Sequence, residues 1–364
     1  MEKLVDENTH VFVNKMESKA GEPVNLGDWV QWYAFDVIGT ITFLKPFGCM
    51  QVEGDMNNMI RNTDTSFRYV SVVGQMPKLH RWLLGSPTGV KLLSRIPFFA
   101  KANHWPYIGV VAARAIHEYD SRSEEEKGRC ANLLAGFRQA QAKHPERLTD
   151  RDLMGFLFAN IAAGSDTTAV TLRSLFYHLV RTPGCYSKLT DEIRAAENAG
   201  ALSSPVTYQE GLNLKYLQAV IKETLRIHPG TPLPLERVVP PEGANLCGTF
   251  VPGGTTVGVS AWVVQRDKRV YGADANKFRP ERWLEPDADQ LRLMERTFLR
   301  FGGGARSCIG KNISILEVTK LVPQVLRKFK LEWASPEKDW VVESYFVAKQ
   351  KGVVMRLIPH SVKS

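Results

Sequence analysis

The feature that most constrains the fold is residues 148–184, LTDRDLMGFLFANIAAGSDTTAVTLRSLFYHLVRTPG, which read as one long helix. Thr149 can cap its start, and a Pro-Gly pair ends it. About 30 helical residues would span roughly 45 Å, which is the width of a whole domain. Between Leu153 and Ala163 only Asn160 is polar, so we expect this half of the helix to be buried on all sides.

The rest of the chain predicts more helices and a little β structure. Apolar periodicity and proline breaks predict helices at 25–44, 54–120 (two or three of them), 183–197, 214–229 and about 308–328. Residues 121–131 predict a charged loop, 278–284 an irregular segment, 230–265 short strands, and the alternating tail a hairpin or small sheet. No credible linker interrupts the chain, so residues 1–364 predict one mainly α domain with minor β structure.

Composition narrows the class of protein. The 44% apolar and 23% charged residues are an ordinary globular balance. The 47 Lys and Arg against 38 Asp and Glu give a net charge of +9. This charge fits an acidic protein partner, an anionic membrane surface or an anionic cofactor. The basic residues are scattered along the sequence instead of clustered, which argues against nucleic-acid binding. The sequence contains no run of about 18 apolar residues, so it predicts no transmembrane helix. The charged N-terminus does not resemble a signal peptide.

The five cysteines are odd in number and far apart, without a CxxC, so they predict neither a disulfide framework nor a zinc pattern. Cys308 stands in the glycine-rich stretch FGGGARSCIG, residues 301–310. Glycines let a backbone approach a flat ligand, while Arg306 and the following helix place positive charge beside the sulfur and favour a thiolate. Haem iron needs one axial protein ligand, and a thiolate is one of its known choices. Taken alone, Cys308 has about even odds of being an ordinary buried cysteine.

This stretch resembles the haem-binding loop of the cytochrome P-450 family, F-x-x-G-x-R-x-C-x-G, with matches at Phe301, Gly304, Arg306, Cys308 and Gly310. The resemblance implies haem b, with Cys308 as the axial iron ligand and Arg306 on a propionate. Phe301 would shield the sulfur, and the glycines, Gly302 included, would let the backbone lie against the macrocycle. The implied fold is mainly α, with the long helix over the haem and the cysteine loop on the proximal side.

A second stretch, AGSDTT at 163–168, resembles the oxygen-activation motif A/G-G-x-D/E-T-T/S. Gly164 leaves room for something flat, and Thr167 can turn its hydroxyl away from the i−4 carbonyl. Asp166 beside Thr167 can relay protons to a bound oxygen species. Alone, the motif favours by about two to one an ordinary core helix with a surface Asp. The resemblance makes Asp166 and Thr167 catalytic and places Ala163 beside the haem.

Two further stretches match the family in its order. Glu223 and Arg226 in ETLR match E-x-x-R, but they lie opposite the apolar stripe, so periodicity alone predicts a surface ion pair of little energy. FRPERW at 278–283 resembles P-E-R-F, with Trp283 replacing the final Phe. The resemblance implies that Arg282 joins Glu223 and Arg226 in a buried charge network that braces the cysteine loop.

Weaker assignments rest on position alone. Arg237 falls where the family often places a second propionate-binding Arg, and a surface strand Arg is equally expected. Family geometry also suggests residues that contact substrate, each as readily explained by core packing: Phe156, Ala163, Thr167, Thr231, Leu233, Leu235, Tyr345 and Phe346.

The resemblance begins partway into the family pattern, because the membrane anchor, the early sheet and the W-x-x-x-R helix of that pattern have no match in this sequence. We therefore expect an N-terminally incomplete domain. A full-length relative would lie on the cytosolic face of the endoplasmic reticulum membrane, and this chain as it stands would be cytosolic or peripheral to a membrane.

The implied function is a monooxygenase that inserts one oxygen atom from O2 into a lipophilic small molecule. Because no dinucleotide fingerprint occurs, electrons would come from NADPH through NADPH-cytochrome P-450 reductase, with cytochrome b5 as a further candidate partner. The overall texture is similar to filamentous-fungal members that act on secondary metabolites. Two alternatives stay open: a haem-thiolate isomerase, dehydratase or peroxygenase, and a non-catalytic remnant that binds little haem.

Overall fold

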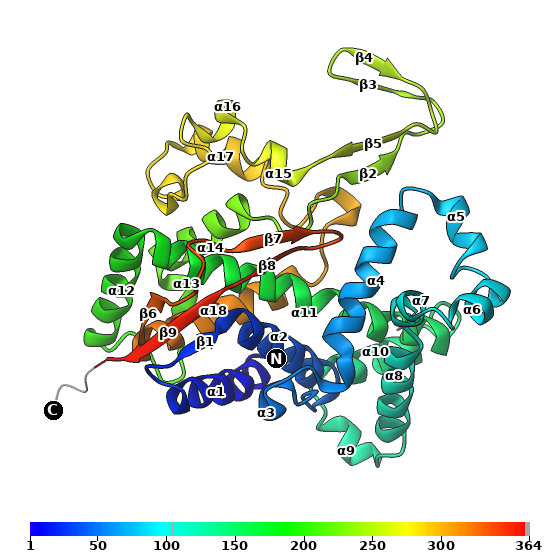
Figure 1. Cartoon of the computed structure of the whole chain (residues 1–364), viewed down its shortest axis with the longest axis horizontal. Coiled ribbons are helices and arrows are strands. Elements are labelled where there is room, and N and C mark those ends of the chain that lie inside the picture. Colours follow the sequence, from blue (N-terminus) through cyan, green and yellow to red (C-terminus); the bar gives the residue numbers. More distant parts are fainter. Residues whose placement is uncertain (104, 361–364) are drawn as a thin grey trace.

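The predicted long helix is α11 (Asp150–Arg181), and it runs through the centre of the molecule (Figure 1). The structure is a computed structural model that describes residues 1–103 and 105–360. A capping box starts α11: the Thr149 hydroxyl accepts from the Asp152 backbone N–H, and the Asp152 carboxylate accepts from the Thr149 backbone N–H. The helix ends at Arg181, just before Pro183, as the sequence predicts.

Burial along α11 contradicts the prediction for its first half. There only a stripe of Leu153, Leu157 and Ile161 is buried, whereas the second half is buried almost all round. The reason is that the first half borders a cavity, into which Ala159 and Asn160 face. An apolar helix surface can line a cavity as well as a packed core, and periodicity does not tell the two apart.

The main core forms where α1 (Glu2–Ser18), α2 (Leu26–Phe43), α11, α14 (Lys215–Ile227) and α18 (Lys311–Lys328) meet. Fully buried representatives are Phe12, Tyr33, Phe176, Val220 and Leu321. Asn25 caps the start of α2, because its side chain accepts from the Asp28 backbone N–H at 3.3 Å. The fold is therefore mainly α, as predicted.

The prolines between residues 54 and 120 start helices more often than they divide them. Five helices occur there where two or three were expected: α4 (Met59–Val73), α5 (Pro77–Trp82), α6 (Pro87–Leu93), α7 (Pro97–Ala102) and α8 (Trp105–Asp120). Pro77, Pro87 and Pro97 occupy the first turn, where a missing N–H breaks no helical hydrogen bond. The predicted charged loop contains α9 (Glu124–Gly128), which a Ser123 capping box begins.

Short helices complete the α part. They are α3 (Cys49–Val52), η1 (Met56–Asn58), α10 (Leu133–Lys143), α12 (Pro183–Asn198), α13 (Tyr208–Asn213), α15 (Ala261–Val264), α16 (Lys268–Tyr271), η2 (Pro280–Trp283), α17 (Ala288–Arg296) and η3 (Gly304–Arg306). The η elements are single 3₁₀ turns, and η2 lies in the segment that was predicted to be irregular.

The strands form small antiparallel sheets. One sheet has the order β1 (Pro23–Asn25), β9 (Val354–Pro359) and β6 (Phe329–Trp333), and pairs Val24 with Met355 and Leu331 with Leu357. Three two-stranded ribbons are β2 (Leu235–Val238) with β5 (Thr256–Val259), β3 (Ala244–Leu246) with β4 (Thr249–Val251), and β7 (Val341–Ser344) with β8 (Ala348–Lys351). In Figure 1 the β3–β4 ribbon projects from the body, and the tip of β7–β8 reaches α4.

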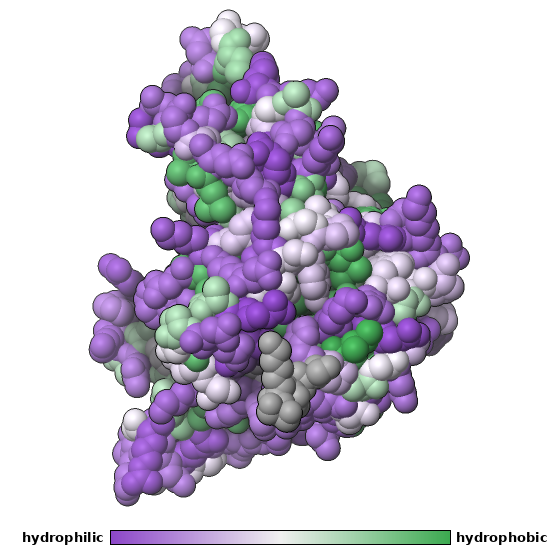
Figure 2. Space-filling model, turned by 90° about the vertical axis from the view of Figure 1, so that its left-hand side faces the viewer, coloured by the Kyte–Doolittle hydropathy of each residue, from purple (hydrophilic) through white to green (hydrophobic). Residues whose placement is uncertain are grey.

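The face drawn in Figure 2 is mostly hydrophilic, and its hydrophobic side chains form separate small clusters instead of one continuous patch. Among the described residues, none of the helices combines the length and the apolar character that crossing a membrane would require.

Candidate functional site

A cavity of about 320 Å³ lies between α11, the cysteine loop and α18. It brings together ten of the residues that the sequence singled out: Ala163, Gly164, Thr167, Thr231, Leu235, Phe301, Gly302, Arg306, Cys308 and Gly310. These residues come from three segments that are far apart in the chain, so the fold assembles them into one site.

The cysteine loop is a tight turn that exposes its thiol. Gly302 and Gly304 have φ of +71° and +62°, a left-handed conformation that glycine adopts without strain. The Cys308 backbone N–H donates to the Phe301 carbonyl at 2.8 Å and closes the loop. The Cys308 side chain is exposed and lines the cavity. The helix behind it, α18, begins at Lys311, slightly later than expected.

Two arginines stand beside this loop. Arg306 is exposed, lines the cavity, and has no hydrogen bond or ion pair within the described residues, so its guanidinium can bind an anionic group. Arg237 on β2 donates to the Gly303 carbonyl at 3.2 Å. Arg237 therefore contacts the cysteine loop, although it is also an exposed strand residue.

Arg300 is a cavity residue that the sequence analysis missed. It is buried and donates to the Thr171 hydroxyl at 3.0 Å and, weakly, to the Thr167 carbonyl at 3.5 Å, so it ties the cysteine loop to α11. Within the described residues no carboxylate pairs with it. Burial lowers the pKa of Arg300 to about 10, while the charge of Cys308 acts in the opposite direction. The sequence did offer a signal for Arg300: a charged residue among the apolar residues of FLRF, directly before Phe301.

The α11 motif departs from two expectations. The Thr167 hydroxyl donates to the i−4 carbonyl, that of Ala163, at 2.9 Å, so it does not turn away from it. The space beside Gly164 is taken by Ile38 of α2, whose side chain would lie 2.8 Å from an added Cβ. The glycine therefore serves helix packing here, because a larger residue would force the Ile38 side chain to move.

Asp166 is buried, so the alternative of a surface aspartate is wrong. Its side chain is 2% exposed, and Oδ1 accepts from Gln31 Nε2 at 2.7 Å. Gln31 in turn accepts from Arg173 at 2.8 Å. Oδ2 is buried without a partner among the described residues. Burial raises the pKa of Asp166, and the charges of Lys349 and Arg173 oppose that shift.

Another buried acid, Glu317 of α18, lines the large cavity, which Asp166 does not, and the sequence analysis missed it as well. Its Oε2 is buried and has no partner within the described part of the chain. Burial raises its pKa well above the ordinary value. Burial thus favours the neutral, protonated form of the Glu317 carboxyl group. Its signal was an acid inside the apolar run ILEV.

The Glu223–Arg226 pair is fully buried, which contradicts the surface pair that periodicity predicted. Both side chains are 0% exposed, and Arg226 donates to both carboxylate oxygens at 2.7 and 2.8 Å. Arg282 lies 3.4 Å from Glu223, and the indole of Trp283 donates to Glu223 at 3.0 Å. Arg226 also donates to the Gln265 and Ala275 carbonyls, both at 2.7 Å. The charged network that the resemblance implied is thus present.

The substrate candidates divide into two groups. Thr231 and Leu235 line the cavity with Ala163 and Thr167, whereas Leu233 is half-buried and is not part of the lining. Phe156 is 40% exposed and packs against Phe137 of α10, with ring centres 5.4 Å apart. The structure does not bring Phe156 into the cavity.

The two hairpin candidates also lie outside the cavity, beside α4. Phe346 stacks on Phe67 with ring centres 5.0 Å apart, and the guanidinium of Arg68 lies 4.9 Å from the centre of the Tyr345 ring.

The residues of the cavity fit a haem. One thiol supplies the single protein ligand that haem iron requires, and no group of three or more His, Cys, Asp or Glu in the described residues competes as a metal site. Arg306, on the cavity wall, and Arg237, on β2 beside the cysteine loop, offer cations for the propionates. Ile38, Leu299 and Ile313 add apolar wall area.

Comparison with known proteins agrees with this chemistry. Residues 1–356 match the cytochrome P-450 family. The chain is 39% identical over 342 residues to a cytochrome P-450 monooxygenase of Aspergillus terreus, covering 90% of this chain and 66% of that protein. It is 37% identical over 360 residues to the monooxygenase cicH of Emericella nidulans, covering 98% and 70%. It is 34% identical over 359 residues to the monooxygenase ACRTS1 of Alternaria alternata, covering 98% and 94%.

The chain therefore spans about two thirds of the first two relatives and most of the third. The names of these fungal relatives support the predicted class, an oxidoreductase that incorporates oxygen. With its cysteine loop, its central helix and its buried Glu–Arg–Arg network, this chain belongs to the cytochrome P-450 family.

Proposed function

We propose that this chain carries the catalytic site of a haem-thiolate monooxygenase, which inserts one oxygen atom from O2 into a lipophilic small molecule. One observation carries the proposal: a single cavity is lined both by the thiol of Cys308 and by Ala163 and Thr167 of α11. Family membership supports it.

When bound, the haem would supply the oxygen-activating chemistry. Cys308 would hold the iron, and Arg306 and Arg237 would bind the propionates. Phe301 would shield the sulfur. Gly302 and Gly304, both left-handed, keep Cβ atoms away from the loop surface that meets the ring.

Asp166 and Thr167 would manage protons. Thr167 lines the cavity, and its hydroxyl, now bonded to the Ala163 carbonyl, can rotate toward a guest that accepts a hydrogen bond. Asp166 adjoins it in sequence, and burial raises the Asp166 pKa, so this acid can hold a proton close to the reaction.

The remaining wall would bind and orient the substrate. Ile38, Ala159 and Leu235 exclude water, while the Asn160 Nδ2 is buried without a partner in the described part of the chain and can donate to a polar substrate group. We infer a lipophilic substrate with few polar groups, of the kind found among fungal secondary metabolites.

Electrons would arrive from NADPH through NADPH-cytochrome P-450 reductase, with cytochrome b5 as a second candidate donor. The net charge of +9 suits an acidic redox partner. The location of full-length relatives at the endoplasmic reticulum membrane stays a prediction, as does peripheral membrane contact by this chain.

One spectrum tests the core of the proposal. The haem-loaded protein is reduced and exposed to carbon monoxide, and we expect the red-shifted Soret band of thiolate-ligated haem, which Cys308→Ser should abolish. Folded protein without this band would favour a non-catalytic remnant. Turnover is then compared with NADPH plus reductase and with peroxide alone, and turnover with peroxide alone would favour a peroxygenase.

A further inference from the structure

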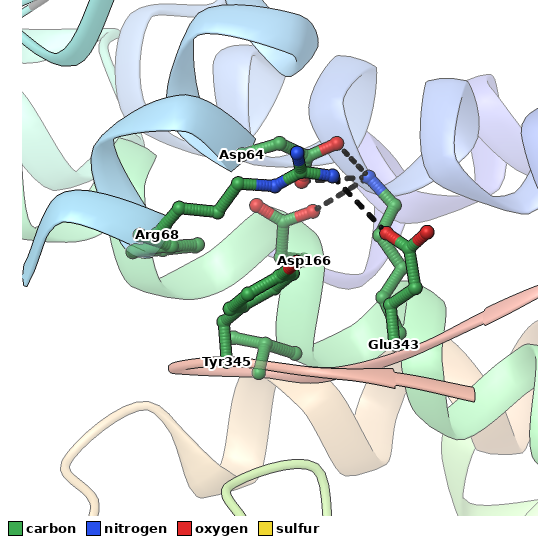
Figure 3. Close-up of a pocket in the computed structure, with 8 residues that line it drawn as sticks. Asp64, Arg68, Asp166, Glu343 and Tyr345 are labelled. Carbon is green, nitrogen blue, oxygen red and sulfur yellow. Dashed lines mark hydrogen bonds and ion pairs between the residues drawn. The ribbon is translucent and has the colours of Figure 1, made fainter. Parts of the chain in front are cut away.

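A second, much smaller cavity lies on the outer side of Asp166. It has a volume of about 20 Å³, enough for one water molecule, and is walled by Asp64 and Arg68 of α4 and by Glu343, Tyr345 and Lys349 of the β7–β8 hairpin (Figure 3). Thr167, the next residue of α11, lines the large cavity instead. The two residues of the acid–alcohol pair therefore face different cavities.

Charged and aromatic pairs hold α4 to the hairpin around this small cavity. Lys349 Nζ lies 2.9 and 2.7 Å from the two oxygens of Asp64. Arg68 lies 3.2 Å from Glu343, and Phe67 stacks on Phe346. We call this contact the α4–hairpin seam; its ion pairs are Asp64–Lys349 and Arg68–Glu343.

Lys349 is shared between two carboxylates. While it bonds Asp64, its Nζ is only 3.8 Å from Asp166 Oδ1 (Figure 3). The Asp64 side chain is 36% exposed and that of Asp166 is 2% exposed, so Lys349 stands between solvent and the buried acid. A small shift of this one ammonium group exchanges one partner for the other.

Both neighbours of Lys349 are tied to other segments, Ala348 by its backbone N–H and Gln350 by its side-chain amide, so we expect such a shift to be a side-chain movement. The Ala348 N–H donates to the Gly230 carbonyl at 2.8 Å, and the Gln350 amide donates to the Val170 carbonyl of α11 at 3.0 Å. Since Thr231 lines the large cavity, β8 is also tied to a segment of the substrate wall.

Groups on every neighbouring element set the charge of Asp166. Gln31 of α2 donates to Oδ1, and Arg173 lies behind Gln31 on α11 itself. Two charged groups act on Asp166 from other elements: Lys349 from β8 and Asp64 from α4. Arg68 and Glu343 lie on the wall of the small cavity. Asp28 of α2 is close enough to feel both Arg173 and Lys349. Oδ2 of Asp166 and Nη1 of Arg173 are buried without a hydrogen-bond partner in the described residues.

We propose that the α4–hairpin seam is the proton inlet of this site, and that Lys349 is a positioning residue which holds Asp166 ready to receive a proton from the water-sized cavity. This rests on the function proposed above. A proton passes from solvent near Asp64 to water in the small cavity and then to Asp166. Asp166 gives up one proton toward Thr167 for each that it receives, and no electrons move.

The test compares Lys349→Met with Lys349→Arg, which keeps the charge, and with Lys351→Met. Lys351 is two residues further along β8 and pairs with Glu343 at 2.6 Å, but its side chain is 54% exposed and lies outside both cavity linings. All variants are first checked for the thiolate-haem band.

With NADPH and reductase, we expect Lys349→Met to form about ten-fold less product per NADPH consumed, at unchanged KM. The solvent deuterium isotope effect on product formation should be larger, because Asp166 regains its proton more slowly. Lys349→Arg should restore most of the yield, and Lys351→Met should match the wild type. An unchanged yield and deuterium effect in Lys349→Met would overturn the proposal.

A second readout needs no turnover. In a double-mutant cycle of unfolding, Asp166→Asn should remove part of the destabilisation that Lys349→Met causes, the rest being the lost Asp64 pair, whereas the effects of Asp166→Asn and Lys351→Met should add. Additivity in the Lys349 cycle would show that Lys349 and Asp166 are uncoupled and would overturn the positioning role. If the wild-type protein lacks the thiolate-haem band, the proposed function itself is wrong. If the wild type is active and the Lys349→Met variant behaves like it, only the proton-inlet proposal is wrong.

Discussion

The indole N–H of Trp283 donates a hydrogen bond to Oε2 of Glu223, with 3.0 Å between the heavy atoms. The family segment that this residue belongs to ends in Phe, which has no donor. Trp283 and Glu223 are both buried, so no water replaces the contact if it is lost. Trp283 therefore adds a polar contact to the buried charge network of Glu223, Arg226 and Arg282.

Trp283→Phe should lower the free energy of unfolding by about 1–3 kcal/mol, because a buried carboxylate loses a donor while the ring volume is largely kept. Chemical denaturation measures this. Trp82→Phe is the matched control, since Trp82 is 81% exposed, and its effect should stay within about 0.5 kcal/mol. Equal effects at the two sites would contradict a special role for the Trp283 hydrogen bond.

Glu223→Ala should be more damaging, with a loss of about 3–5 kcal/mol, because it leaves Arg226 and Arg282 buried without their carboxylate. We also expect haem incorporation to fail, although Glu223 does not line the cavity. Haem content per folded protein is the measurement, and the exposed Glu332→Ala is the control. Normal haem content in Glu223→Ala would show that the network does not brace the cysteine loop.

Local signals predicted the helices well and tertiary contacts poorly. The caps at Thr149 and Asn25 depend only on residues three positions away, and both are present. Glu223 was placed on the surface because its own helix cannot reveal that η2, more than fifty residues later, covers it. The cysteine loop could be found because its residues are contiguous. Arg300 and Glu317 stand out locally as charged residues beside apolar ones, but only the fold shows that they reach the cavity.

The cysteine loop offers a matched pair of glycine substitutions. Gly304→Ala forces an alanine into φ of +62°, which should cost about 1–2 kcal/mol and reduce haem binding. At Gly303 φ is −157°, and an added Cβ would meet only Leu299 at 3.8 Å, so Gly303→Ala should be tolerated. Unfolding and haem titration of both variants decide this. An equal loss at both positions would mean that ring clearance, rather than backbone strain, governs the loop.

The neutral state of Glu317 gives a pH prediction. Its folded pKa lies well above the ordinary 4.5, so the folded protein binds a proton that the unfolded chain releases. The stability from this group is complete below about pH 4.5 and falls as the pH rises toward the folded pKa. Glu317→Gln keeps the shape and removes the titration. The variant should match the wild type near pH 4.5 and exceed its unfolding midpoint at pH 8; parallel curves would mean that Glu317 is not buried as an acid.

Arg300 is the reverse case, a buried cation whose pKa is lowered to about 10. Burial disfavours its charged form, and this penalty applies at all pH values below about 10; it is relieved only as the pH rises above that value. Arg300→Met should therefore raise the free energy of unfolding of the haem-free protein at pH 7 by about 1–3 kcal/mol. Arg300→Lys keeps the charge and should not. If the Met variant is instead less stable, the hydrogen bonds from Arg300 to Thr171 and to the Thr167 carbonyl outweigh the cost of burying the charge.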